Sequence, residues 1–523
     1  MAGQRSGALV IPPPVKGWNV LDPLSNMDPE YAPELENFFP SMGTVDLRNG
    51  RTRFATPTLG SALHTFKYGS YDKLIFANGL IGLADISAGG AGTSILGAVV
   101  TNAGFTYSQQ FRDRIFLTTI STSDDCYSWT GTGNIAPAYF SGPSSDDKDL
   151  GVMTVYKSRL YFGQISTASM WYGGVDVIGG TLGTPAALTE FPFQSLLKIG
   201  GSIAFIGSVT RAKDFSEDEL FAAISTEGEI LIYQGDYPGD PNWSIIGHYF
   251  IPRPLGAKAF FYLGSTLMII TNQGILPIDT IMGGSFSGLT SSVLTGDISR
   301  AIRSQFTEAA KTIGASGDSS TYPRWSGVNY PRGNFIIINV PTTTYTGTNL
   351  SVQFVMNTLT GAWCKFTGWP ANSFVVWQDR LYMTWAGNIG TGGTGSAVWL
   401  CDDGYADYDS ANAIQTRTIK LRHAFNYLGN NIANKVFTMA IPTIYQSEGL
   451  SLTLDCDVDY TDATATSTET DTTDTAYKLY QPRMGLTNQV NGSAVSIRID
   501  GTVTQKRMSL QATKVYWLEG GID

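Results

Sequence analysis

The apolar positions of the chain follow a recurring pattern of two short β-rich runs separated by a polar or glycine turn. The second run contains a key apolar residue, as in Asp72-Lys73-Leu74-Ile75-Phe76. Another large apolar residue, such as Phe111 or Trp377, precedes most key positions by four or five residues. This pattern predicts β-hairpins. The key residues of the seven copies are Leu74, Ile115, Leu160, Ile203, Leu267, Phe335 and Leu381.

The spacing of these copies predicts the fold. The key residues are separated by 41, 45, 43, 64, 68 and 46 residues, and a further apolar strand such as Val398-Trp399-Leu400 follows most copies. A period of about 40 to 50 residues with four short strands per unit is typical of a β-propeller, whose blades bury each other's faces. We therefore expect an all-β protein with a propeller of about seven blades (six to eight). The alternative is an array of β-sandwiches with accidental spacing.

The two long intervals carry insertions. One is the charged stretch Arg211–Glu219, and the other includes Thr295–Ile313. In the second insertion Asp297 can cap a helix, and Gly314 can end it. Apolar residues recur there at every fourth position, at Ile298, Ile302, Phe306 and Ala310. This pattern predicts one amphipathic helix, inserted in the propeller near residues 295–313.

The hairpin repeat occupies residues 43–415 and leaves a segment at each end. Residues 1–42 form a proline-rich arm, which we expect to be extended. Residues 416–523 contain alternating strands such as Lys435–Met439 and predict a small C-terminal β domain. Within that domain, the acidic Thr-rich stretch 461–476 has no large apolar residue, so we expect a disordered loop there.

Composition supports a folded protein and limits its partners. The 523 residues are 42% hydrophobic and only 15% charged, with 58 Gly, so the chain can bury large cores. The formal net charge is −10, but seven of the acids lie in residues 455–477, where no Lys or Arg occurs. The rest of the chain is nearly neutral. Without a basic stripe we expect no tight nucleic-acid binding, although a weak, sliding contact stays compatible with this charge.

The residues that carry chemistry form no recognisable site. The three histidines, His64, His248 and His423, are more than 170 residues apart, and the four cysteines include no CxxC pair. Carboxylate clusters at 146–149 and 402–409 are explained by solvated turns, with calcium as the alternative. Residues 122–129 match the Asp-box motif of sialidases only loosely, and we interpret them as a turn. We therefore expect a protein that is not an enzyme, with no catalytic residue, no metal site and no cofactor.

The ends and the thiols indicate where the chain folds. The start has an apolar stretch of only five residues before Pro12-Pro13-Pro14, and no run of 18 apolar residues occurs anywhere. We expect no signal peptide and no membrane anchor. The cysteines are expected to be buried or half-buried free thiols, which suits folding in a cytoplasm.

Short motifs at both ends and in the middle of the chain carry a family resemblance. The motifs are Trp18-Asn19, Asp22-Pro23-Leu24, Met27, Pro29, Ala32, Leu35, Asn37, Phe39-Pro40, Val45, Leu47-Arg48, Gly50, Thr360-Gly361-Ala362-Trp363, Asp379-Arg380-Leu381-Tyr382, Asp402-Asp403-Gly404 and Glu519-Gly520-Gly521. In their order and spacing they resemble the tail nozzle (hub) proteins of short-tailed bacteriophages, which also contain a β-propeller. The acidic stretch 461–476 is a departure from that pattern.

The resemblance implies a structural virion protein at the distal end of a short tail, assembled in the host cytoplasm. Such a protein would form a homo-oligomeric ring of six copies that continues the DNA channel, retains the packaged genome and releases it on infection. Its partners would be the head–tail adaptor, a tail fibre or spike, and, without sequence preference, the packaged double-stranded DNA. A nearly neutral body would let that DNA slide.

The arm is the candidate partner interface, at Trp18, Asn19, Phe38, Phe39 and Pro40. Its aromatic side chains would anchor a partner if they are exposed. The alternative is an arm that packs along its own propeller. In the first case, deletion of residues 1–40 leaves a folded monomer that fails to enter particles.

A rival interpretation comes from another class of protein. Propellers also occur in carbohydrate-binding proteins and in sialidase-like hydrolases, and the chain is rich in aromatic residues. The missing series of Asp-boxes speaks against this alternative, a carbohydrate-binding or glycan-hydrolysing virion protein.

Overall fold

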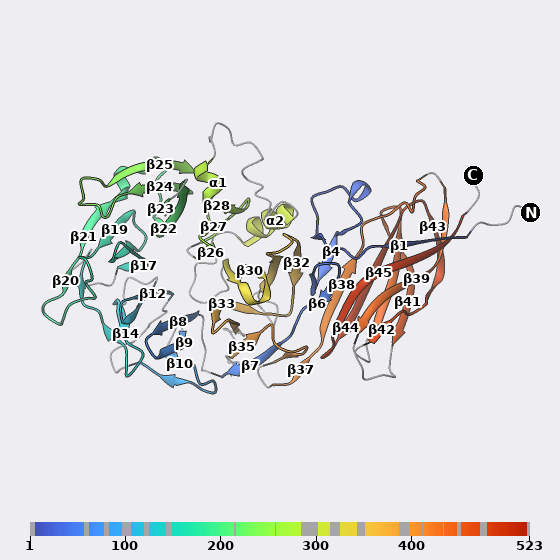
Figure 1. The fold of residues 1–523 in the computed structure, drawn as a ribbon, viewed down its shortest axis with the longest axis horizontal. Helices are drawn as coiled ribbons and strands as arrows, with labels where there is room; N and C mark the ends of the chain where they lie inside the picture. The colour runs from blue at the N-terminus through green and yellow to red at the C-terminus, as the bar shows by residue number, and fades with distance from the viewer. Residues whose placement is uncertain are drawn as a thin grey trace, which may run out of the picture.

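The computed structural model describes residues 6–56, 62–77, 83–96, 106–119, 125–142, 149–213, 216–256, 258–283, 302–313, 325–342, 351–385, 397–409, 412–431, 433–446, 451–470 and 478–519. These residues are mostly β-strand and include two short α-helices, α1 (Ile278–Gly283) and α2 (Arg303–Ile313). Figure 1 shows a ring of small sheets with an elongated β-sandwich beside it.

Seven sheets follow one another around the ring in the described part of the chain, and apart from the parallel pair β7 (Arg51–Ala55) and β36 (Asp407–Tyr408) the strands of the ring pair antiparallel. The strands of the first five are β8 (Ala62–Tyr68), β9 (Tyr71–Ala77), β10 (Leu83–Asp85) and β11 (Thr93–Ser94); β12 (Tyr107–Phe111), β13 (Arg114–Thr118), β14 (Tyr127–Trp129) and β15 (Ala136–Pro137); β17 (Leu150–Tyr156), β18 (Arg159–Gln164), β19 (Ser169–Tyr172) and β21 (Thr189–Pro192); β22 (Ile203–Lys213), β23 (Ser216–Ser225), β24 (Glu229–Gln234) and β25 (Ser244–Phe250); and β26 (Phe260–Leu263), β27 (Thr266–Thr271) and β28 (Gly274–Pro277).

The last two sheets complete the ring and use strands from both ends of the chain. β7, which precedes the first sheet in sequence, pairs with β35 of the last, so the ring is closed inside one sheet. The strands are β29 (Ser326–Tyr330), β30 (Phe335–Pro341), β31 (Ser351–Asn357) and β32 (Trp363–Phe366); and β33 (Ala371–Trp377), β34 (Arg380–Trp385), β35 (Val398–Cys401), β7 (Arg51–Ala55), β36 (Asp407–Tyr408) and β37 (Ile414–Gln415).

Neighbouring sheets bury their faces against each other, as blades of a propeller do. The rings of Phe66 and Trp129 lie 6.1 Å apart between the first and second sheets. Tyr156 and Phe221 lie 5.4 Å apart between the third and fourth. The prediction of an all-β propeller with six to eight blades is confirmed.

One copy of the repeat was assigned to the wrong strand. Ile203 lies on β22, the first strand of its sheet, whereas Leu160 and Leu267 lie on second strands, as predicted. β22 and β23 are 11 and 10 residues long, and their hairpin takes up the charged stretch that we interpreted as an insertion. Both strands of a hairpin alternate apolar and polar residues, so the pattern alone did not distinguish them.

The sandwich consists of two packed sheets, and the arm supplies strands to both. One sheet contains β39 (Lys435–Gln446), β45 (Met508–Glu519), β42 (Lys478–Tyr480) and β43 (Met484–Gly492), to which the arm region adds β1 (Ser6–Ile11), β5 (Phe38–Pro40) and β6 (Val45–Leu47). The other contains β38 (Arg417–Arg422), β44 (Val495–Val503), β40 (Ser451–Val458) and β41 (Thr461–Thr470), to which the arm adds β4 (Glu34–Glu36). The arm strands β2 (Gly17–Trp18) and β3 (Tyr31–Ala32) pair with each other, and β2 also pairs with β32.

Two smaller predictions can be compared directly. The predicted helix is present as α2 over residues 303–313, whereas residues 295–301 lie outside the described part. The predicted disordered loop is wrong for residues 461–470, which form β41 and pair with β40. Threonine is β-branched and suits a strand once a partner strand is available. Residues 471–476 lie outside the described part.

Candidate functional site: the junction of propeller and sandwich

The propeller and the sandwich share one sheet, and the arm strand β4 joins them. β4 runs parallel to β32 of the propeller on one side and antiparallel to β38 of the sandwich on the other. In this register Glu36 lies beside both Lys365 and Lys420. The shared strand makes the two parts one hydrogen-bonded unit.

Asn37 turns the chain directly after β4. Its φ of 61° lies in the left-handed region, which asparagine tolerates better than most residues. Its Oδ1 accepts hydrogen bonds from the Thr367 N–H at 2.9 Å and from Arg48 Nε at 2.7 Å. Its Nδ2 donates to Thr367 Oγ1 at 2.7 Å and to the Thr418 carbonyl at 2.8 Å. The buried amide therefore links the arm, the propeller edge and the first sandwich strand.

Arg48 and Asp407 form a buried ion pair at the same place. Nη1 of Arg48 donates to Oδ1 of Asp407 at 3.0 Å, and Nη2 donates to Oδ2 at 2.5 Å. Nη2 also donates to the Thr367 carbonyl at 2.9 Å, and the guanidinium lies 4.8 Å from the centre of the Trp369 ring. A two-point arginine–carboxylate pair fixes both partners in orientation as well as in distance.

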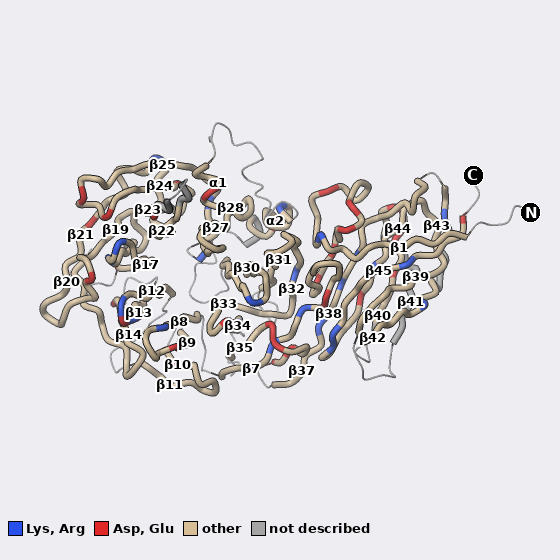
Figure 2. Tube along the Cα trace, viewed as in Figure 1, with Lys and Arg blue, Asp and Glu red and all other residues tan. Residues whose placement is uncertain are grey.

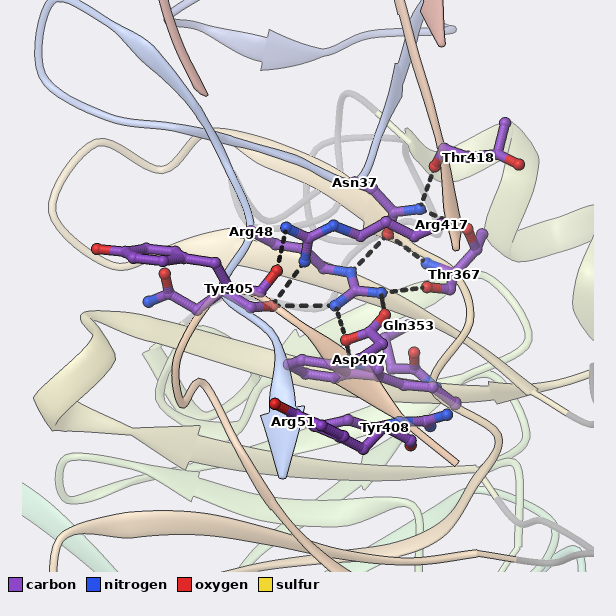
Figure 3. A network of polar contacts seen from close by, with 12 residues as sticks. Asn37, Arg48, Arg51, Gln353, Thr367, Tyr405, Asp407, Tyr408, Arg417 and Thr418 are labelled. Carbon is purple, nitrogen blue, oxygen red and sulfur yellow. Dashed lines mark hydrogen bonds and ion pairs between the residues drawn. The ribbon is translucent and has the colours of Figure 1, made fainter. Parts of the chain in front are cut away.

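Two further arginines lie around this pair (Figure 3). Nε of Arg51 donates to the Tyr408 carbonyl at 3.2 Å. Nη2 of Arg417 donates to the carbonyls of Tyr405 and Lys506, both at 3.1 Å. These bonds connect the last propeller sheet to the turn that follows it and to the sandwich. We call the set Asn37, Arg48, Arg51, Thr367, Asp407 and Arg417 the junction cluster.

Burial and charge together set the pKa values in the junction cluster. Burial lowers the pKa of Arg51, and it lowers the pKa of Arg417 to about 9. Burial alone would raise the pKa of Asp407, but the charge and hydrogen bonds of Arg48 hold it below its usual value, so the carboxylate stays ionised. Burial also raises the pKa of the neighbouring Cys401 thiol, which keeps it protonated and unreactive. The junction cluster therefore holds parts of the chain together through contacts between charged groups.

The five arm residues predicted as a partner interface lie at this junction. Trp18, Asn19, Phe38 and Pro40 are buried, and Phe39 is half-buried. Trp18 Nε1 donates to a main-chain carbonyl of the arm at 3.1 Å, and its ring lies 5.3 Å from a phenylalanine ring of β31. The condition for aromatic anchors, exposure, is therefore not met by Trp18 and Phe38. The alternative, an arm that packs against its own chain, describes the structure, because the apolar side chains of the arm strands complete the cores on either side.

Sequence reasoning missed Arg51, Asp407 and Arg417 as members of one cluster. Asp407 stood in the acidic run 402–409, for which a turn or a calcium site was considered. In the structure Asp402 and Asp403, like Asp407, face the segment after the arm: Asp402 accepts a hydrogen bond from an asparagine amide at 2.8 Å and Asp403 from the Thr52 hydroxyl at 2.9 Å. Asp409 instead accepts hydrogen bonds from the turn that follows it. Across the described residues, no group of three or more His, Cys, Asp or Glu side chains is arranged to hold a metal ion.

A cleft with a volume of about 270 Å³ opens beside β4. Its charged side chains are already paired, since Lys365 Nζ lies 3.7 Å from Glu36 and Arg422 Nη2 lies 2.9 Å from Asp457. The lining residues are Trp18, Val20, Pro33, Glu34, Leu35, Glu36, Gln305, Lys365 and Arg422.

The three histidines each lie beside a partner outside the junction cluster. His64 is 2.8 Å from a serine hydroxyl of the next sheet, His248 is 2.6 Å from the Glu229 carboxylate, and His423 is 3.2 Å from a threonine hydroxyl of the sandwich. The four cysteines are free and buried, which confirms the expectation from their spacing.

Comparison with known proteins gives likenesses in fold alone. No protein-family model and no curated protein matches the chain. Among solved structures, BamB from Moraxella catarrhalis shares 10% identity over 70% of this chain and 96% of its own, with a TM-score of 0.33. Apo AztD from Citrobacter koseri shares 11% over 59% of this chain and 86% of its own, with a TM-score of 0.32. A glycoside hydrolase family 43 arabinoxylan arabinofuranohydrolase from Bacillus subtilis shares 11% identity over 79% of this chain and 94% of its own, with a TM-score of 0.20.

The described residues contain no helix that is both long and apolar enough to cross a membrane.

Proposed function

We propose that this protein is a structural part of a virion. It forms the distal nozzle of a short phage tail as a ring of copies, continues the DNA channel, retains the packaged genome and releases it on infection. One observation carries the proposal. Motifs of the arm and of residues 47–50 that resemble nozzle proteins lie hundreds of residues before the motifs Thr360–Trp363 and Asp402–Gly404, yet these segments meet at the junction of propeller and sandwich.

The contacts between these motifs are specific. Gly50 donates its N–H to the Gly404 carbonyl at 2.9 Å, and a Cβ at Gly50 would lie 2.0 Å from the Ala406 carbonyl oxygen, so only glycine fits. Strand β2, which contains Trp18, pairs with β32 at Trp363. Motifs that serve one junction are expected in proteins that share one arrangement of propeller and sandwich, and this supports the family resemblance.

The physical character of the junction suits a nozzle. A subunit that retains a packaged genome must resist separation of its parts, and a shared sheet with a buried ion pair opposes that separation. Figure 2 shows acidic and basic residues scattered along the described chain, and both kinds gather around β38. A surface of mixed charge grips the DNA backbone weakly, because tight binding needs an excess of Lys and Arg.

The proposal includes the partners of such a nozzle. Copies of the chain form a ring, the ring docks to the head–tail adaptor and to a tail fibre or spike, and packaged double-stranded DNA touches it without sequence preference. The protein acts as a structural part and carries out no catalysis. Buried free thiols are consistent with assembly in the host cytoplasm.

Electron microscopy of virions with a gold-labelled antibody against the purified chain tests the proposal. We expect label at the distal tip of a short tail, lost when the antibody is first absorbed with the purified protein. Particles without label, or label on the capsid, would contradict a nozzle. In that case, the purified protein should be tested for glycan binding and hydrolysis, with Asp-to-Asn variants as controls.

A further inference from the structure

Most outer edges of the propeller sheets are protected against pairing with another strand. An edge strand presents unpaired N–H and carbonyl groups, and proteins limit the consequences with short strands, proline, charge or a covering segment. β11 has only two residues, and β15, β21 and β28 end in proline. The arm covers β32, and β36 lies next to β7.

β25, the outer strand of the fourth sheet, lacks the proline, the charge and the short length that protect these edges, although helix α1 contacts it. It has seven residues, Ser-Ile-Ile-Gly-His-Tyr-Phe from Ser244 to Phe250, with no proline, lysine, arginine or carboxylate. Among the strands the structure describes, β24 is its one partner. Ile245, Ile246 and Phe250 are 42%, 37% and 38% exposed. This is a long, apolar and uncharged edge on the rim of the propeller.

β1, at the other end of the molecule, has the same character. Its six residues, Ser-Gly-Ala-Leu-Val-Ile, carry no charge, and within the described residues it pairs with β45 alone. Leu9 and Val10 are 39% and 55% exposed. Among the other edge strands of the sandwich, β41 contains Asp462 and Glu469, β42 contains a lysine, and β5 ends in proline. β43 carries no charge, but β41 lies against it.

We propose that β25 of one copy pairs with β1 of a second copy of this chain. Within the described residues each strand has one partner strand, their lengths match within one residue, and neither contains Lys, Arg, Asp or Glu. Pairing through main-chain groups needs no particular sequence, and the exposed apolar side chains add burial.

The position of the two edges makes this contact head-to-tail. In Figure 1, β25 lies on the rim of the propeller, and β1 runs across the sandwich toward the N-terminus, away from the propeller. Each copy therefore offers a different edge to each of its two neighbours, and such contacts give a closed ring when the rotation between copies closes. The pairing adds to the proposed nozzle function a specific contact between copies of the chain. It rests on that proposed function only in the step that the copies close into a ring.

Cross-linking between two single-cysteine variants tests the pairing. Val10→Cys and Ile246→Cys are purified separately, mixed, and treated with a short bis-maleimide; the native cysteines are buried and do not compete. We expect a cross-linked dimer in the mixture and little in either variant alone. A dimer that forms as readily in one variant alone, or in neither sample, would overturn the contact.

Charged substitutions at the two edge strands give an independent test of the pairing. Ile246→Lys and Val10→Lys should each weaken self-association in sedimentation velocity by about tenfold or more, since a charged edge opposes pairing. Ile414→Lys is the matched control, because Ile414 is 41% exposed on the two-residue strand β37. Thermal unfolding confirms that each variant is folded. A wild-type protein that stays monomeric, or equal loss in the control, would overturn the inference.

The two proposals can fail separately. Label at the tail tip together with a wild-type protein that shows no edge-dependent association would refute the contact and leave the nozzle standing. Edge-dependent association together with unlabelled virions would support the contact and refute the nozzle.

Discussion

The Arg48 guanidinium and the Asp407 carboxylate are 359 residues apart in sequence and form a two-point ion pair inside the protein. Their side chains are 1% and 4% exposed. Arg48 follows the arm, and Asp407 belongs to β36 in the last sheet of the ring, so the pair ties the start of the propeller to its end. If one partner were removed, the charge of the other would stay buried, and no water could replace the lost contact.

Removal of either partner should therefore be costly. We expect Arg48→Met and Asp407→Leu each to lower the free energy of unfolding by about 3–5 kcal/mol, the usual range for a broken buried pair. The double variant should recover part of that loss, because two apolar side chains leave no unpaired charge. Urea denaturation of the four proteins measures these values.

The exposed pair of Lys16 and Asp28 supplies the control for this series. Lys16 Nζ and Asp28 Oδ2 are 2.6 Å apart, but both side chains are 43% exposed. Solvent screens such a pair, so Lys16→Met should change stability little. Equal effects of Arg48→Met and Lys16→Met would show that the junction cluster does not hold the fold together.

The arm should be required for folding rather than for docking alone. Phe38 is fully buried, so Phe38→Ala should lower the free energy of unfolding by about 3–5 kcal/mol. Met42→Ala, at a side chain that is 73% exposed, should have little effect. Deletion of residues 1–40 removes β4 from the shared sheet, and we expect an unfolded or aggregated product in circular dichroism and size exclusion. A folded monomer would restore the arm as a separate docking element.

The propeller was predictable because its signal is local and repeated. Leu74, Leu160 and Leu381 recur at a period that only stacked blades explain well, and each lies where its own hairpin places it. Ile203 was misplaced because the two strands of a hairpin carry the same alternation. The repeat therefore predicted the architecture better than it predicted which strand is which.

The junction was not predictable because its contacts are set by the tertiary fold. A sequence shows that Trp18 and Phe38 are large and apolar, but it does not show whether their own chain or a partner covers them. Asp407 is one acid in an acidic run, and only the fold brings Arg48 to it. The threonines of β41 look disordered when considered alone, and β40 provides the hydrogen bonds that order their main chain.

His423 should make the protein sensitive to acid. Burial lowers its pKa to about 4 in the folded state, whereas an unfolded chain has the ordinary value near 6.5. Between these values the unfolded state binds a proton that the folded state does not, so stability falls as the pH falls from about 6.5 toward 4. The contribution is up to roughly 3 kcal/mol.

A glutamine at this position removes the titration. Unfolding free energies at pH 7, 5.5 and 4.5 should fall less steeply for His423→Gln than for the wild type, although the variant starts lower because the Thr513 contact changes. Parallel curves for the two proteins would contradict the assignment.

Glu229 should also contribute to stability above acidic pH. Its carboxylate is fully buried, accepts the N–H groups of Lys198 at 2.6 Å and Ile199 at 2.9 Å, and lies 2.6 Å from His248 Nε2. Burial alone would raise the pKa of Glu229, but these hydrogen bonds hold it below its usual value. The stabilising contribution is therefore complete above about pH 4.5, the ordinary value, and is lost as the pH falls through the lower folded value.

Glu229→Gln separates this charge from the size of the side chain. An amide keeps one acceptor oxygen, but its NH₂ group cannot accept the second N–H, so one buried donor loses its partner. We expect a loss of about 1–3 kcal/mol at pH 7 in urea denaturation. The loss should shrink at pH 3, where the wild-type carboxylate is also becoming protonated. Glu190→Gln, at an exposed side chain that accepts a hydrogen bond from Ser169 Oγ at 2.7 Å, should be nearly neutral at both pH values. A deficit of Glu229→Gln that stays constant with pH would contradict the assignment of this contribution to the charge of the carboxylate.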